Sequence, residues 1–194
     1  EAWLVGKGMD PAGQHHEGYD SFCWDFVLAD QANESRGEYP NGTGGAPLYA
    51  SAGGRVVTST EDQPNGTAVA NLLEIEQAPH EIAGYMHLRQ KSILATVNDT
   101  VQRAHKVALA GTTGMGACTD CNHLHFGVAD KPGGAAGFVT IPIAFSDYEI
   151  RTPSNEWQHV ARGIPLVGQV VRNAPASPER FSAIWIRSSQ HRPW

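Results

Sequence analysis

The sequence lacks the features of several large protein classes. It has no Lys/Arg cluster and carries a net charge of −6, so we do not expect a nucleic-acid partner. No apolar run approaches the roughly 20 residues that cross a membrane, so we expect no membrane span. Repeats and low-complexity tracts are missing, and no segment has a long amphipathic-helix period; the nearest candidate is 92–103. These absences favour a globular protein with little helix.

The composition of the chain fits such a protein. Its 194 residues suit one domain, and its hydrophobic fraction of 41% and charged fraction of 18% are those of a globular chain. The 21 glycines and 12 prolines predict many turns, as all-β folds need. Because the first residue is Glu1 and not Met, we expect a processed or truncated form.

Short strand-like segments follow one another between Gly-rich turns, which predicts an all-β fold built as a compact antiparallel sheet or sandwich. In the first segment the alternation puts Trp24 and Phe26 on one face and Cys23, Asp25 and Val27 on the other. The predicted strands are 22–28, 48–50, 55–58, 70–76, 83–88, 106–110, 122–128, 138–143 and 165–171.

Nine histidines are many for an acidic protein, and several lie near these strands. His123 and His125 are two positions apart on a predicted strand, so both rings leave the same face. Asp25 stands between two aromatic residues on another strand, an unusual place for a carboxylate. Catalytic zinc takes three protein ligands from His and Asp/Glu and keeps a fourth position for water.

His16, Asp25 and His125 would supply such a set, and the bound water would then have a pKa of about 7. His87 and His123 would be left to take the proton of that water and to stabilise the oxyanion. No H-E-x-x-H helix is present, so histidine would have to replace the usual glutamate base.

Five segments, taken in order, resemble the lysostaphin-type (LytM-like) zinc endopeptidases. The resemblance covers roughly 16–128 and implies a compact antiparallel β-sheet with a groove. Carried over by motif, it implies zinc (Zn²⁺) on His16, Asp25 and His125, with His87 and His123 as the catalytic pair. The segments are His16 with Trp24-Asp25-Phe26, then 45–57, 84–88, 109–114 and 123–128.

From this resemblance we expect a metallopeptidase domain at 1–146 and a C-terminal extension, 147–194, packed on the same domain. The implied function is zinc-dependent hydrolysis of peptide bonds in peptidoglycan cross-links or stem peptides, by a zinc-activated water assisted by two histidines. Another peptide substrate is not excluded, and which bond is cut stays open. We expect a monomer, secreted or in the cell envelope. The alternative is a degenerate member that binds cell wall or regulates another hydrolase.

The sequence departs from the family pattern at two places. The family often spaces its first ligands as H-x-x-x-D, but Ser21 occupies that upstream position, which leaves His16 as the expected ligand and His15 as its rival. Cys118 and Cys121 form a C-x-x-C that suits a disulfide, a metal half-site or two plain thiols. A structural zinc on this pair with His123 and His125 is disfavoured, because four ligands on one short strand do not easily surround an ion.

Overall fold

A computed structural model describes residues 1–8, 16, 18–29, 41–118, 120–131 and 139–175. Its regular elements are almost all strands, so the all-β prediction is confirmed, and none of the described helical turns could cross a membrane. The elements are β1 (Ala2–Lys7), η1 (Gly18–Asp20), β2 (Trp24–Leu28), η3 (Asn41–Thr43), β3 (Pro47–Tyr49), β4 (Gly54–Thr60), β5 (Leu72–Ala78), β6 (Glu81–Met86), β7 (Thr100–Val101), β8 (Lys106–Leu109), β9 (Leu124–Asp130), β10 (Phe145–Arg151), β11 (Trp157–Gly163) and β12 (Val170–Asn173).

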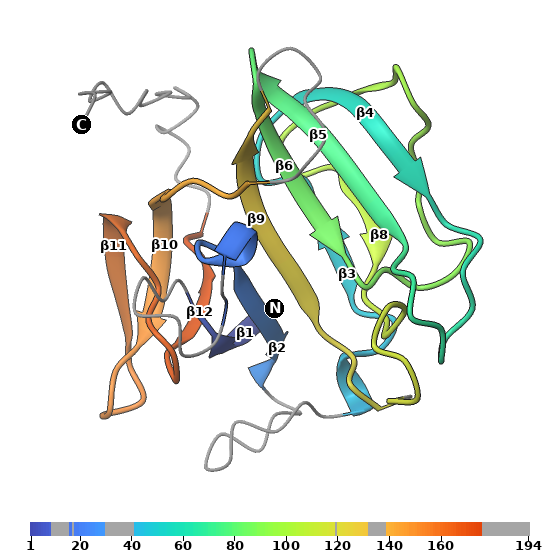
Figure 1. The fold of residues 1–194 in the computed structure, drawn as a ribbon. Coiled ribbons are helices and arrows are strands. Elements are labelled where there is room, and N and C mark those ends of the chain that lie inside the picture. The colour runs from blue at the N-terminus through green and yellow to red at the C-terminus, as the bar shows by residue number, and fades with distance from the viewer. Residues whose placement is uncertain (9–15, 17, 30–40, 119, 132–138, 176–194) are drawn as a thin grey trace.

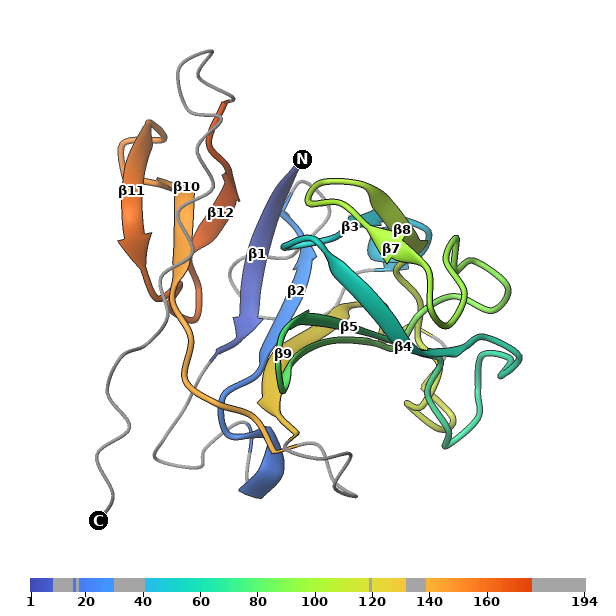
Figure 2. The same ribbon diagram turned by 90° about the horizontal axis from the view of Figure 1, so that it is seen from above.

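The strands form one large antiparallel sheet and one small one (Figure 1). The large sheet has ten strands in the order β11-β10-β12-β1-β2-β9-β6-β5-β4-β7. The small sheet pairs β3 with β8, and Figure 2 shows it beside β4 and β7. Strands β2, β9 and β6 are therefore direct neighbours near the middle of the large sheet, although they are far apart in the sequence.

The alternation predicted for the first strand is present in β2. Trp24 and Phe26 belong to the main hydrophobic core with Tyr85 and Phe126, whereas Val27 packs in a second cluster on the other face. Asp25 also points away from the main core and is only 2% exposed. Both faces of β2 are thus covered, so the Asp25 carboxylate is held in a buried position.

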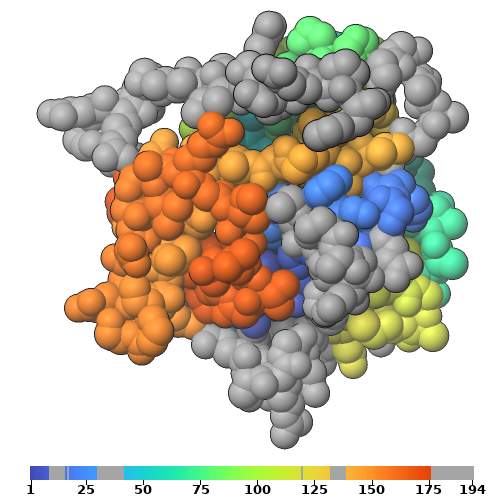
Figure 3. Space-filling view, turned by 60° about the vertical axis from the view of Figure 1, so that its left-hand side comes forward, coloured from blue at the N-terminus to red at the C-terminus, as the bar shows by residue number. Residues whose placement is uncertain are grey.

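The C-terminal strands continue the sheet beyond β1. β12 pairs with β1 in antiparallel register, and β10 pairs with both β12 and β11. The ring of Phe145 at the start of β10 meets the ring of Trp24 edge-on at 5.1 Å. In the space-filling view these strands (orange to red) form a continuous surface next to the N-terminal segments in blue (Figure 3).

Two sequence predictions about strands are corrected. In 138–143, Phe138 lies outside the described residues and the rest holds only an isolated bridge at Thr140, partly because Pro142 has no N–H for a ladder. In 165–171 the strand begins only at Val170, after a turn closed by Gln169 N–H to Leu166 O at 3.0 Å. The nearest candidate for a helix, 92–103, is irregular chain apart from β7.

The predicted groove over the histidines stays a prediction. Two surface depressions among the described residues are lined by other side chains. One has Arg89, Lys106 and Leu109 in its wall, and the other has Trp3 and Tyr49.

Candidate metal and catalytic site

Cross-strand pairing brings Asp25 and His125 together. The two are direct partners in the β2–β9 register, so their side chains leave the same face of the sheet as close neighbours. His123 lies two residues before His125, at the entrance of β9, and forms an isolated bridge with Gly111. The prediction that both histidines point to one place is confirmed by their approach to the same carboxylate oxygen.

His87 reaches this group by a break in the strand. β6 ends at Met86, whose direct partner on β9 is His125, so a regular next residue would point to the opposite face. His87 instead has φ of 59°, in the left-handed region that a non-glycine residue seldom adopts. Its ring lies 4.5 Å from the ring of His123 and 5.7 Å from that of His125, centroid to centroid.

One oxygen of Asp25 is the centre of the cluster. Its Oδ1 is 2.8 Å from His125 Nδ1, 3.4 Å from His16 Nε2 and 3.7 Å from His123 Nε2. Its other oxygen, Oδ2, lies 3.9 Å from Lys7 Nζ. The structure therefore brings all five predicted site residues into one group, in which His87 is half-buried and the other four are buried, with exposed fractions of 7% or less for His16, Asp25, His123 and His125.

Asp25 and the histidines around it change the pKa values of one another. Burial by itself raises the pKa of Asp25, but hydrogen bonds from His125 and His16 outweigh burial and hold this pKa well below its usual range. Burial lowers the pKa of His16, yet the hydrogen bond and negative charge of Asp25 leave that pKa raised. Asp25 is thus an ionised carboxylate in a buried place, where charges are normally paired or bind metals.

The tautomers of the two remaining histidines are set by backbone carbonyls. His87 Nδ1 donates to Thr113 O at 2.7 Å, and His123 Nδ1 donates to Cys121 O at 2.7 Å. Because a carbonyl only accepts, the neutral form of each ring carries its lone pair on Nε2. Burial, followed by the charge of His123, lowers the pKa of His87 to about 4, and burial also lowers the pKa of His123.

His16, Asp25 and His125 fit a zinc ion. One donor atom from each lies within 4.8 Å of the others, and the set of two imidazoles and one carboxylate is a usual one for catalytic zinc. Bonds of about 2.0–2.2 Å in a tetrahedron put ligand atoms about 3.4 Å apart, close to the distance from His16 Nε2 to Asp25 Oδ1. The second nitrogens, His16 Nδ1 and His125 Nε2, are buried without a hydrogen-bond partner among the described residues.

The sequence left two alternatives open, a structural zinc on Cys118 and Cys121 and His15 as a rival first ligand. Cys118 and Cys121 form a disulfide, so the structural-zinc alternative loses its two thiolates. A second cluster with donor atoms at metal-binding separation joins Asp20, Cys23 and His125. Burial raises the pKa of the Cys23 thiol, which disfavours the thiolate that a metal needs. The rival ligand His15 lies outside the described residues.

Sequence reasoning missed several neighbours of the site. Lys7 meets Asp25 because the two are partners across β1 and β2, and nothing in the local sequence marks it. Asp20 Oδ1 lies 3.9 Å from the second nitrogen of His125. The carbonyls of Thr113 and Cys121 carry no side-chain signature at all, so only the fold reveals them.

A comparison with protein families finds one match. The model described as "Peptidase family M23" matches residues 34–135, which is more than half of the chain. The match includes His87, His123 and His125 and begins after Asp25. No curated protein matches the chain.

Among solved structures, the chain is similar to the catalytic domain of a prophage-encoded protein, EnpA, from Enterococcus faecalis. That match has 17% identity and a TM-score of 0.47, and it covers 72% of this chain and 88% of the other. Lysostaphin from Staphylococcus simulans matches with 18% identity and a TM-score of 0.46, over 87% and 75% of the two chains. A zinc-containing peptidase from Vibrio cholerae matches with 26% identity and a TM-score of 0.40, over 66% of this chain but only 32% of its own length.

Proposed function

The chain belongs to Peptidase family M23, and on that premise we propose that it is a zinc-dependent metalloendopeptidase that cuts peptides of bacterial peptidoglycan. The observation that carries the proposal is the arrangement around Asp25. Three zinc-type donors, from His16, Asp25 and His125, lie beside two further histidines whose Nδ1 atoms are occupied by carbonyls.

The proposed roles follow from the hydrogen bonds. His16, Asp25 and His125 would hold the ion, which when bound supplies a Lewis acid and an acidified water as nucleophile. His87 and His123 each present a lone pair at Nε2, so either ring can accept a proton there. Once protonated, the same nitrogen can donate a hydrogen bond to a developing oxyanion or a proton to the leaving amine.

Several finer points belong to this proposal. The substrates are glycine bridges or stem-peptide cross-links, and the protein works as a monomer outside the cytoplasm, secreted or in the cell envelope. The Cys118–Cys121 disulfide agrees with an oxidising compartment. The metallopeptidase part is 1–146, and the rest, 147–194, is an extension whose described residues, 147–175, pack on it through β12 and Tyr148, whereas 176–194 lie outside the described residues.

Two variants test the proposal when purified in parallel with wild type. Zinc is measured by elemental analysis, and hydrolysis by release of amines from purified cell walls, from a pentaglycine peptide and from cross-linked stem peptides. We expect about one zinc per chain and cleavage of at least one substrate by wild type. Asp25→Ala should lose both the zinc and the activity.

His87→Ala separates metal binding from catalysis. It should keep its zinc and lose about 10²–10⁴ in rate, the usual contribution of a general acid or base. Glu61→Gln, away from the cluster, is the matched control and should keep both properties. Zinc-loaded wild type that binds cell walls but releases no amines would instead establish the degenerate, non-catalytic alternative.

A further inference from the structure

One loop orients both of the histidines that are not proposed as ligands. It joins β8 to β9, is described at 111–118 and 120–123, and is called the carbonyl loop below. Near its start Thr113 O accepts from His87, and near its end Cys121 O accepts from His123, both at 2.7 Å. His87 follows β6 and His123 is the last residue of the loop before β9, so the contacts with this loop are what they have in common.

The two carbonyls of this loop are held in different ways. Thr113 is anchored to the sheet, because its hydroxyl donates to Leu88 O at 2.8 Å and accepts from Asn71 N–H at 2.9 Å. Both Thr113 and Asn71 are fully buried. This end of the loop is therefore fixed by a buried hydrogen-bond network next to His87.

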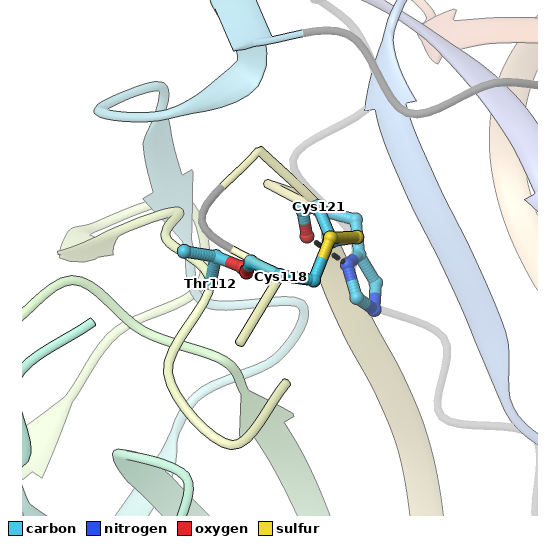
Figure 4. The surroundings of a disulfide bond; sticks show 4 residues. Thr112, Cys118 and Cys121 are labelled. Atoms are coloured by element: carbon cyan, nitrogen blue, oxygen red, sulfur yellow. Dashed lines mark hydrogen bonds between the residues drawn. A yellow bond between two sulfur atoms is a disulfide. The ribbon is translucent and has the colours of Figure 1, made fainter. Parts of the chain in front are cut away.

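Cys121 is held by its covalent bond. It is joined to Cys118, whose own carbonyl accepts from the Thr112 hydroxyl at 2.7 Å (Figure 4). The disulfide thus ties the carbonyl that faces His123 to the anchored start of the loop, only a few residues away. Apart from the disulfide and the bridge between His123 and Gly111, the described residues just before His123 are small or polar and lie outside the hydrophobic core, so they offer little packing to fix a carbonyl.

We propose that the Cys118–Cys121 disulfide is a positioning element for His123: it holds the Cys121 carbonyl where that carbonyl keeps the proton of His123 on Nδ1 and its lone pair on Nε2. The inference rests on the proposed function. Opening the disulfide then lowers turnover through His123, while the ion stays on His16, Asp25 and His125 and the anchored His87 keeps its orientation.

The test opens and closes the bond in the folded, zinc-loaded protein. A water-soluble phosphine reduces the disulfide to two thiols and becomes the phosphine oxide, with the oxygen taken from water. Alkylation after denaturation counts one thiol, Cys23, before reduction and three after it. Zinc per chain, kcat and KM on the peptide that wild type cleaves fastest, and ¹⁵N shifts of the ring nitrogens are measured in each state.

We expect reduction to leave one zinc per chain and the ring shifts of His87 unchanged. The His123 ring should lose its fixed Nδ1–H tautomer, and kcat should fall about 10- to 100-fold, the scale of a misplaced catalytic group, with KM little changed. Reoxidation should restore both. The Cys118→Ser, Cys121→Ser double variant should match the reduced protein, and Met115→Leu, which leaves the disulfide in place, should match the oxidised one.

Two results would overturn the inference. Either kcat and the His123 ring shifts stay unchanged with three thiols present, or reduction releases the zinc, which would make the disulfide a general structural staple. A wild-type protein without zinc or hydrolysis in its oxidised state would be a different failure, that of the proposed function itself.

Discussion

At the scale of single residues, the site depends on buried polar side chains whose hydrogen bonds fix the backbone next to His87. Asn71 connects the segment of Gln63 with the segment of Leu88, because its side-chain amide donates to Gln63 O at 2.9 Å and to Leu88 O at 3.2 Å. Thr113 closes the same network. These buried contacts surround the backbone of His87 and Leu88 and fix the left-handed turn that directs the His87 ring.

Replacing Thr113 by Val should destabilise this turn. The substitution keeps the shape of the side chain but leaves the Asn71 N–H buried without its acceptor, which costs about 1–3 kcal/mol. Leu88 O keeps the Asn71 amide as a donor and so contributes little to the loss. Urea unfolding measures the change, and Thr113→Ser, which retains the hydroxyl, should lose no more than about 1 kcal/mol. Equal stability of the Val and Ser variants would show that the Thr113 hydroxyl does not stabilise the turn.

The sequence predicts the side chains of the site better than their orientation. His16, Asp25, His87, His123 and His125 were all predicted from their types and motifs, and all five lie together. The proton positions of His87 and His123 depend on the carbonyls of Thr113 and Cys121, and every residue has a carbonyl. Sequence cannot distinguish these carbonyls from others, so their role required the three-dimensional structure.

At the scale of elements, the carbonyl loop lies against the chain that follows β6. A Cβ atom on Gly111 would stand 2.7 Å from Arg89 N and 3.0 Å from His87 O, both of them backbone atoms that cannot rotate away. Any side chain here would clash with these atoms, so only glycine permits the start of the loop to lie this close to the chain that follows β6.

Gly111→Ala should therefore separate the two segments, at a cost of about 1–3 kcal/mol, and should reduce hydrolysis while zinc remains bound. Gly53→Ala is the matched control, since its nearest atom would be Val101 O at 3.3 Å. Thermal unfolding and the peptide assay compare the two variants. Full activity of Gly111→Ala would show that this contact does not position His87.

Strand prediction missed β1 but succeeded for most other segments with a strong hydrophobic pattern. The segments around Trp24, Val56, Ile75, Ala83 and Val128 all lie in strands of the large sheet. The pattern failed for β10 and β11, because this hairpin lies at the edge of the sheet and is rich in polar and charged side chains. Its pairing comes from backbone hydrogen bonds, which hydrophobic periodicity does not report.

At the scale of the whole molecule, we propose that the C-terminal extension folds as one unit with the metallopeptidase part. β12 covers the edge of β1, and Tyr148 and Val171 belong to the main core.

A chain ending at residue 146 would leave the edge of β1 unpaired and part of the core exposed, so it should aggregate or unfold. A chain ending at residue 175 keeps β12 and should fold. Size-exclusion chromatography measures the aggregation of the two truncated chains, and circular dichroism measures their folding. A folded, zinc-binding 1–146 fragment would contradict the proposal.

Zinc should also stabilise the whole fold, because an ion bound only by the native state shifts unfolding by mass action. Removing it with a chelator should lower the melting temperature of wild type by several degrees, and readding zinc should restore it. His16→Ala, which lacks one proposed ligand, should show no such shift. Identical chelator effects in both proteins would mean that the ion is bound elsewhere.

The most direct test of the central claim is the position of the ion itself. Crystals of the zinc-loaded protein, measured on both sides of the zinc absorption edge, give an anomalous difference map. We predict one peak at about 2.0–2.2 Å from donor atoms of His16, Asp25 and His125. A peak on Asp20 and Cys23 without Asp25, or no peak at this cluster in zinc-loaded crystals, would contradict the account.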